Sequence, residues 1–334
     1  MSDNNTILEI KDLYVDFETD DGVVHAVNGM NLELQRGRSL GLVGETGAGK
    51  TTTALSVLRL IPDPPGVIRG GSITIDGKDL LALPIKEVRK LRGNFVSMIF
   101  QDPMTSLNPT LQVGEQIAEV LRAHDKKLSK SESLKRAADM LKLVGIAEDR
   151  ISDYTHQFSG GMRQRVDIAI ALACNPQLLI ADEPTTALDV TIQAQILEVM
   201  KELRQKLGTS LIMITHDLGI VAEICDDVSV MYGGRVVEHG SLEDVFNDTK
   251  HPYTEGLFNS LPNINNRTSM LKPIPGLMLD PTESPAGCPF APRCSYATDK
   301  CFEEKPPRFD FNETHYAECH RYSEEGFRLN GRDN

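Results

Sequence analysis

The sequence predicts an α/β protein built on a largely parallel sheet. Short apolar runs alternate with longer stretches of helical spacing over the first 240 residues. A glycine-rich loop also follows one apolar run and precedes a helical stretch. The rest of the chain holds 10 of the 18 prolines but only 5 of the 26 glycines. A second, differently built unit therefore follows the α/β part.

Seven apolar runs bounded by turn residues or helical stretches are expected to be strands. In chain order they are Ile7–Val15, Ala26–Leu34, Ser39–Val43, Val96–Phe100, Leu178–Ala181, Leu211–Thr215 and Val228–Tyr232. Apolar residues at helical spacing predict the helices Thr51–Leu60, Val113–His124, Ser131–Val144, Gly161–Cys174, Val190–Leu207 and Leu218–Cys225, with short ones at Ser241–Asp248 and Tyr253–Leu261. The chain after Pro262 is rich in proline and is expected to be irregular.

The composition is that of an ordinary globular protein, with 334 residues, 40% hydrophobic and 25% charged. A net charge of −13 argues against a nucleic-acid partner, because such proteins carry basic surfaces. No apolar run approaches the ~20 residues of a membrane span, and the first residues lack the features of a signal peptide. We therefore expect a soluble, cytosolic chain in which disulfides are rare.

The glycine-rich loop fits the pattern G-x-x-x-x-G-K-[ST]. Its residues are Gly44, Glu45, Thr46, Gly47, Ala48, Gly49, Lys50 and Thr51, followed by Thr52. Glycines let the backbone N–H groups approach phosphates, and the following helix adds its positive dipole end. Lys50 is expected to reach the β- and γ-phosphates and Thr51 to ligate Mg²⁺. The alternative, a chance glycine-rich turn, fits the flanking strand and helix less well.

Two carboxylates, Asp182 and Glu183, end an apolar run. Such a pair is by itself also typical of a solvated loop. Downstream of a phosphate loop, Asp182 is expected to hold Mg²⁺ and Glu183 to polarise an attacking water as general base.

A third segment, Phe158–Arg165, opens a helix with Ser159, Gly160 and Gly161, 19 residues before the Leu178 strand. A plain serine helix cap is the alternative. With the two motifs above, the first 240 residues resemble the ATP-binding-cassette (ABC) ATPases. In that family this segment is the signature motif, from whose usual outer residues Phe158 and Met162 depart.

The resemblance implies a fold and further site residues. The fold is a P-loop core sheet with a helical subdomain and an antiparallel β subdomain. Gln101 would be the Q-loop residue that senses Mg²⁺ and the lytic water, and His216 the switch histidine at the γ-phosphate. Thr186–Asp189 resembles the D-loop, with Asp189 facing the partner. Phe17, with Tyr14 as second choice, would stack on adenine.

The family also implies a composite site. Two cassettes dimerise head to tail, so that ATP on the Lys50 loop of one faces the Ser159-Gly160-Gly161 helix end of the other. Hydrolysis of the γ-phosphate then shifts the dimer between closed and open states.

Four of the six cysteines, Cys288, Cys294, Cys301 and Cys319, fall in one 32-residue stretch. Structural zinc sites usually contain close C-x₂₋₄-C pairs, which are absent here, whereas Cys₄ ligation suits a [4Fe–4S] cluster. Iron–sulfur, zinc and plain buried thiols all remain open from the spacing. Cys174 and Cys225 are expected to be buried helix residues without a role.

The second unit resembles the C-terminal extension of oligopeptide/dipeptide importer ATPases. The resemblance rests on His251–Thr254, Leu261-Pro262, Pro275-Gly276 and the run Cys288–Cys294, together with Phe158–Arg165 and Ala181–Gln195. Some members of that family carry a [4Fe–4S] cluster on these four cysteines. The implied domains are a cassette over 1–250 with a helical subdomain at about 102–158, a small Cys-rich extension over 251–322 and a polar tail over 323–334.

This family implies an ATPase that energises peptide import at the cytoplasmic face of the cell membrane. Its partners would be two permease subunits, a paralogous ATPase (or a second copy) and, indirectly, an extracytoplasmic solute-binding protein. An importer of nickel or another small solute is the nearest alternative. A soluble ABC protein of translation or DNA repair is less suited, because only one phosphate loop is present and no long coiled coil fits between Lys50 and Ser159. An exporter cassette would lack the extension.

Overall fold

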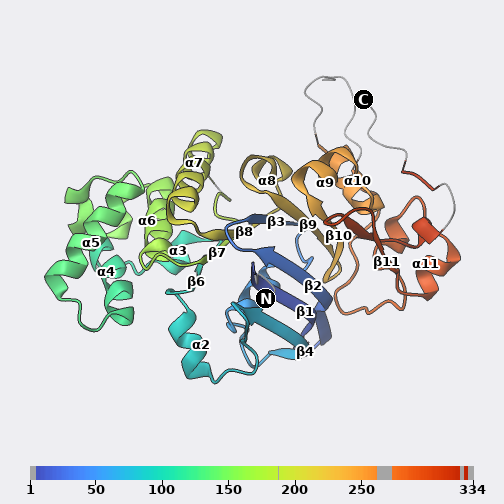
Figure 1. Ribbon diagram of the computed structural model, residues 1–334, viewed down its shortest axis with the longest axis horizontal. Coiled ribbons are helices and arrows are strands. Elements are labelled where there is room, and N and C mark those ends of the chain that lie inside the picture. The colour runs from blue at the N-terminus through green and yellow to red at the C-terminus, as the bar shows by residue number, and fades with distance from the viewer. Residues whose placement is uncertain (1–4, 187, 262–272, 324–326, 330–334) are drawn as a thin grey trace.

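The computed structural model describes residues 5–186, 188–261, 273–323 and 327–329. Ala187 of the expected D-loop, Pro262 and most of the expected 323–334 tail lie outside the described residues. Two sheets organise the rest (Figure 1). No helix in the described part is long and apolar enough to cross a membrane.

The larger sheet has eight strands in the order β11-β12-β10-β9-β3-β8-β7-β6. The strands of its parallel part are β3 (Ser39–Val43), β6 (Val96–Ile99), β7 (Leu178–Asp182), β8 (Ser210–Thr215) and β9 (Asp227–Tyr232). All residues of β3, β7 and β8 are buried, which explains why their sequences are continuous apolar runs. The predicted parallel α/β core is therefore confirmed.

The smaller sheet is antiparallel, with the order β2-β1-β4-β5. Its strands are β1 (Thr6–Thr19), β2 (Gly22–Gln35), β4 (Gly66–Ile75) and β5 (Lys78–Asp79). The strands predicted in β1 and β2 are correct in place but several residues too short, and β4 was not predicted. Register shifts interrupt the pairing of β1, so its alternation is visible only in pieces.

Alternation along the parallel strands divides the core into two layers. Leu179 and Ala181 face one hydrophobic cluster, which the helices cover, whereas Leu178 and Ile180 face a second cluster against the antiparallel sheet. The main helices are α1 (Lys50–Val57), α4 (Val113–His124), α5 (Lys130–Leu143), α6 (Gly160–Leu172), α7 (Val190–Leu207) and α8 (Leu218–Ile224). Shorter helices are α2 (Ile85–Leu91), α3 (Pro103–Ser106), α9 (Leu242–Asn247), α10 (Pro252–Asn259) and α11 (Asp299–Glu303), with 3₁₀ turns at Glu148–Ser152, Thr155–Gln157, Ala291–Arg293 and His320–Ser323.

The extension is not wholly irregular, which corrects the prediction for the chain after residue 262. Strands β11 (Arg308–Asp310) and β12 (Tyr316–Glu318) form a hairpin, and β12 pairs with β10 (Arg235–Ser241). This pairing covers what would otherwise be an open edge of the main sheet. Strands β11 and β12 have only three residues each, too few for a visible alternation. In Figure 1 the extension lies at one end of the molecule and helices α4 and α5 at the other.

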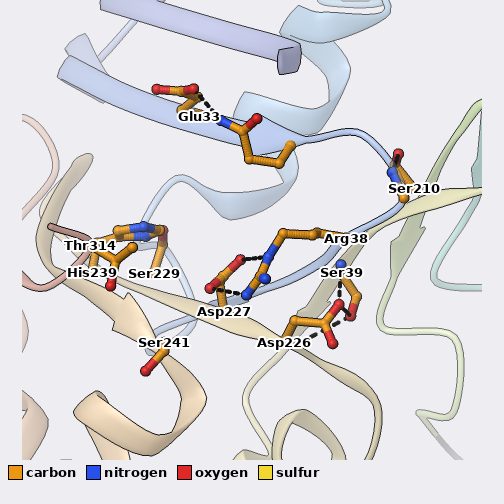
Figure 2. A network of polar contacts seen from close by, with 12 residues as sticks. Glu33, Arg38, Ser39, Ser210, Asp226, Asp227, Ser229, His239, Ser241 and Thr314 are labelled. Carbon is orange, nitrogen blue, oxygen red and sulfur yellow. Dashed lines mark hydrogen bonds and ion pairs between the residues drawn. The ribbon is translucent and has the colours of Figure 1, made fainter. Parts of the chain in front are cut away.

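Polar contacts fix the amino-terminal ends of the central strands (Figure 2). The Arg38 guanidinium donates to both carboxylate oxygens of Asp227, at 2.7 Å each. The Asp226 carboxylate accepts from the backbone N–H of Ser39 at 2.8 Å and from its hydroxyl at 2.7 Å. Because these contacts join β3 to β9, they brace the strand whose other end carries the phosphate loop.

Candidate functional site

The phosphate loop connects β3 to α1 in the middle of the main sheet. Gly49 precedes the helix with φ 97°, and a Cβ there would collide with the Ala26 carbonyl of β2. Glycine is therefore required at this position both by conformation and by space. The loop leads directly into the first turn of α1, where the backbone N–H groups of a helix can bind phosphate.

Lys50 lies inside this loop with its side chain largely buried. Its Nζ donates to the carbonyl oxygens of Gly44 at 2.7 Å and of Glu45 at 3.0 Å. Burial lowers the pKa of Lys50, and the charges of Glu183, Asp182 and Glu45 oppose that effect. The ammonium group thus holds the loop around itself, at the place where phosphate oxygens would bind.

Asp182 ends β7 and is 2% exposed. The Thr51 hydroxyl hydrogen-bonds to its carboxylate, while Oδ1 has no partner among the described residues. Burial raises its pKa. A buried carboxylate oxygen without a donor, beside a threonine hydroxyl, is suited to a divalent cation.

Glu183 collects three of the predicted side chains around one carboxylate. Gln101 Nε2 donates to Oε2 at 3.0 Å, as does the Thr186 hydroxyl at 2.9 Å, and His216 Nδ1 lies 3.3 Å from Oε1. Burial alone would raise the pKa of Glu183, but the contacts with Thr186 and His216 outweigh it, so the pKa lies below its usual value. Glu183 also has φ 46°, a costly backbone conformation found mostly at functional sites.

Lys50, Glu183 and His216 line one open pocket of about 370 Å³, whereas Asp182 lies behind its wall, in contact with Thr51. Its walls are Phe17, Val24, Ala26, Thr46, Gly47, Gly49, Lys50, Thr51, Thr52, Gln101, Glu183, His216 and Pro281. Phe17 stands at this pocket, whereas the ring of Tyr14 packs against Gly29 and is not part of the wall. Sequence reasoning missed Val24, Ala26 and Pro281, which carry no polar side chain to attract attention.

The signature segment lies elsewhere. Ser159 caps helix α6, with its Oγ accepting from the Met162 N–H at 3.4 Å, and the two glycines form the first turn. Gly161 packs against Ile192 of α7. None of the three signature residues lines the pocket of its own chain. Asp189 caps α7 through a 3.0 Å bond from the Ile192 N–H, beside the largely exposed Val190.

The four clustered cysteines line a second, much smaller cavity of about 10 Å³, together with His251 and His320. All six cysteines of the chain are free thiols. Burial raises the pKa of Cys294 to about 11 and the pKa values of Cys288 and Cys319 to about 12. Within the described residues, no group of three or more His, Cys, Asp or Glu is placed to hold a metal ion. The two solitary cysteines were expected inside helices and buried, but Cys174 and Cys225 lie just beyond the ends of α6 and α8, and only Cys225 is buried.

A family model of ABC transporters matches residues 27–186. The fold also matches solved cassettes. The dimeric structure of cassette MJ0796 in a post-hydrolysis state with ADP and Pi has a TM-score of 0.64 at 27% identity, over 70% of this chain and 98% of that one. The cbiO1 protein of Clostridium perfringens, part of the transporter complex cbiONQ, has a TM-score of 0.62 at 32% identity, over 73% and 92%. The chain is an ATP-binding-cassette ATPase, which hydrolyses ATP.

A second family model, the C-terminal region of oligopeptide/dipeptide transporters, matches residues 237–301. The oligopeptide transport ATP-binding protein OppD of Bacillus subtilis is 53% identical over 314 residues, 93% of this chain and 87% of that protein. The dipeptide transport ATP-binding protein DppD of Lactococcus lactis is 48% identical over 93% of this chain and 89% of its own length. The chain belongs to the oligopeptide/dipeptide family of ABC transporter ATP-binding proteins.

Proposed function

We propose that this chain is the ATP-hydrolysing subunit of an importer for di- or oligopeptides. The observation that carries the proposal is similarity over nearly the full length to proteins named for peptide transport, including the extension that sets this family apart. The chain would work at the cytoplasmic face of the membrane with two permease subunits, a second ATPase subunit and, indirectly, a solute-binding protein. The second ATPase would be a paralogue or another copy of this chain.

The proposed division of the chain follows the same family. Residues 1–250 form the cassette, 251–322 the extension and 323–334 a polar tail. The helices between residues 102 and 158 form the part that grips a permease subunit. Their position at the end of the molecule opposite the extension leaves this surface accessible (Figure 1).

Within the site, Lys50 and the loop amides would bind the phosphates while Phe17 stacks on adenine. Thr51, Asp182 and Gln101 would hold Mg²⁺, for which the unpartnered Oδ1 of Asp182 is suited. When bound, Mg²⁺ neutralises charge that develops on the phosphate oxygens.

Glu183 would orient the attacking water and accept its proton. Its contacts keep the carboxylate ionised, and Gln101 and His216 hold it in place from two sides. His216 would in addition contact the γ-phosphate, which its largely exposed side chain allows.

The signature residues Ser159, Gly160 and Gly161 would act on the ATP of the partner cassette. Their separation from the pocket of their own chain supports this assignment, because a phosphate bound at the start of α6 would have to belong to the nucleotide of another chain. Asp189, at the start of α7, would lie at the same dimer contact.

The four clustered cysteines would hold a [4Fe–4S] cluster with a structural role. Their convergence on one buried cavity supports this proposal. The cavity, however, has room for about one water, so the thiols would have to spread and ionise for the cluster to fit. Protein purified without oxygen should contain iron and acid-labile sulfide in equal amounts, with visible charge-transfer absorption. Iron-free, colourless protein would refute the cluster.

Reconstitution tests the transport proposal. The chain, its permease subunits and the second ATPase are placed in vesicles with ATP on the cytoplasmic side and the solute-binding protein on the other. We expect uptake of labelled peptide and a faster release of phosphate when peptide is added. Uptake of nickel but not of peptide would favour the small-solute importer instead.

A further inference from the structure

The extension reaches back to the phosphate loop. Arg293, in the 3₁₀ turn Ala291–Arg293, donates from Nη1 to Glu45 Oε2 at 2.7 Å and from Nη2 to Glu45 Oε1 at 3.2 Å. Only 5% of the Arg293 side chain is exposed. The Glu45 side chain is 28% exposed, so the contact is partly buried. A two-pronged contact of this kind is geometrically specific and stronger than an exposed ion pair.

The same guanidinium is fixed by its remaining donors. Nε donates to the Pro275 carbonyl at 3.0 Å and Nη1 to the Tyr232 hydroxyl at 3.3 Å. Beneath it, Phe290 packs edge-on against the ring of Tyr232 and tilted against that of Tyr253, with centroids 5.2 and 5.3 Å away. Arg293 is therefore held in one position by the extension and by the end of β9.

Glu45 is held on three sides. Its carboxylate binds Arg293, its N–H donates to the Tyr253 hydroxyl at 2.9 Å, and its carbonyl accepts from Lys50 Nζ at 3.0 Å. Its negative charge acts on Lys50 and lies next to the place where phosphates bind. Without a cation beside it, this carboxylate would compete for Lys50 and repel a polyanion.

The segment before Arg293 also approaches the nucleotide pocket. Pro281 forms part of the pocket wall, and its carbonyl accepts from the His25 N–H of β2 at 2.7 Å. The methyl group of Met278 lies beside Gly47, where it would touch a side chain at that position. The extension thus contacts both the loop and the side of the pocket where Phe17 stands.

We propose that Arg293 is a positioning residue of the nucleotide site, which neutralises Glu45 and holds the phosphate loop ready for ATP. The extension is then a working part of the ATPase rather than an appendage. The claim concerns ATP binding alone, so it holds or fails independently of the transported solute.

The test compares three variants by equilibrium titration with ATP and by the rate of phosphate release. Arg293→Met keeps the buried stem but leaves Glu45 unpaired, and we expect its Kd for ATP to rise about tenfold, with a much smaller change in kcat. Adding Glu45→Gln removes the unpaired charge and should restore Kd to within about threefold of wild type. This rescue separates neutralisation of Glu45 from a merely structural role.

Arg235→Gln is the matched control. It breaks another half-buried arginine–glutamate pair, with Glu318, that also joins the cassette to the extension. We expect it to leave the Kd for ATP unchanged. A Kd unaffected by Arg293→Met, or raised equally by Arg235→Gln, would overturn the proposal. If Arg293→Met does not fold, the variant that combines it with Glu45→Gln is measured instead. A Kd for ATP about tenfold higher than wild type in this double variant would contradict the proposal.

Discussion

The carboxyl ends of the parallel strands and the extension contribute to the nucleotide site in different ways. At the carboxyl ends of the parallel strands, Gln101, Asp182 and His216 lie at or just after the last residues of neighbouring strands, so the sheet itself brings their side chains together. The extension reaches the same site through single contacts such as Arg293–Glu45, 248 residues apart. Chemistry is therefore fixed by the sheet, whereas the loop that binds phosphate depends on how well the extension docks.

The largest expected effect is a loss of ATP hydrolysis on changing Glu183, at the carboxyl end of β7. Glu183→Gln removes the proton acceptor but keeps the size of the side chain, so hydrolysis should fall by a factor of about 10² to 10⁴. ATP binding should persist, and the ATP-bound dimer should accumulate. Phosphate release and sedimentation with Mg²⁺-ATP measure the two effects. Near-wild-type hydrolysis would remove Glu183 from the role of base.

The next largest effect concerns the docking of the extension. The buried carboxylate of Glu238 accepts from the N–H groups of Lys250 and His251, at 2.7 and 2.9 Å, and lies 3.0 Å from His315 Nε2. Glu238→Ala leaves these buried groups unpartnered and should cost about 3–5 kcal/mol.

Thermal melting measures the loss, and an ATP titration shows whether a loosened extension weakens the phosphate loop. Asp310→Ala, which breaks an exposed ion pair with Arg308, is the control and should cost less than about 1 kcal/mol. Equal losses of unfolding free energy in the two variants would show that the buried Glu238–His315 contact does not dock the extension.

The buried carboxylate of Asp167, in helix α6, should make the stability of the fold depend on pH. Burial raises the pKa of Asp167 to about 6, although the Ser106 hydroxyl and the Phe100 N–H donate to it. The folded chain thus binds a proton that the unfolded chain releases near pH 4, so the contribution of Asp167 to stability should fall as pH rises from about 4 to about 6. Asp167→Asn should remove this contribution, so that the difference in stability between variant and wild type grows from about pH 4 to about pH 6 and reaches about 2–3 kcal/mol in favour of the variant at neutral pH. Parallel pH curves for the two proteins would contradict the assignment.

The smallest expected effect is on stability, in two serines that both cap a helix but of which only one is expected to act on ATP. Ser129 and Ser159 cap α5 and α6 through bonds to the N–H groups of Glu132 and Met162. Each change to alanine should cost about 1 kcal/mol of stability. Only Ser159→Ala should also slow hydrolysis, because Ser159 would contact the ATP of the partner. Equal hydrolysis rates in the two variants would make Ser159 a simple helix cap.

The same contrast explains what the sequence could predict. Ser39–Val43, Val113–His124 and Val190–Leu207 match the observed β3, α4 and α7 because their patterns are local and complete. Strand β10 was missed, since the buried Glu238 and the neighbouring His239 interrupt its apolar pattern. The phosphate loop and the strand-end carboxylates form contiguous motifs, so their meeting in one site was predictable.

The contacts of Arg293 were not predictable in that way. Its partners Glu45, Tyr232 and Pro275 are scattered along the chain, and no spacing rule joins them. The sequence did show a Cys-rich unit around Arg293. Which surface of the cassette that unit covers is decided by tertiary packing, as in the contact of Phe290 with Tyr232, rather than by local pattern.

Hydrogen exchange of the phosphate loop tests most directly whether the extension and the loop form one unit. Full-length wild type and Arg293→Met are compared without nucleotide, peptide by peptide. We predict faster exchange in residues 44–51 of the variant, with unchanged protection in β7 and β8, whose amides depend on the sheet alone. Equal exchange of the phosphate loop in both proteins would contradict the account.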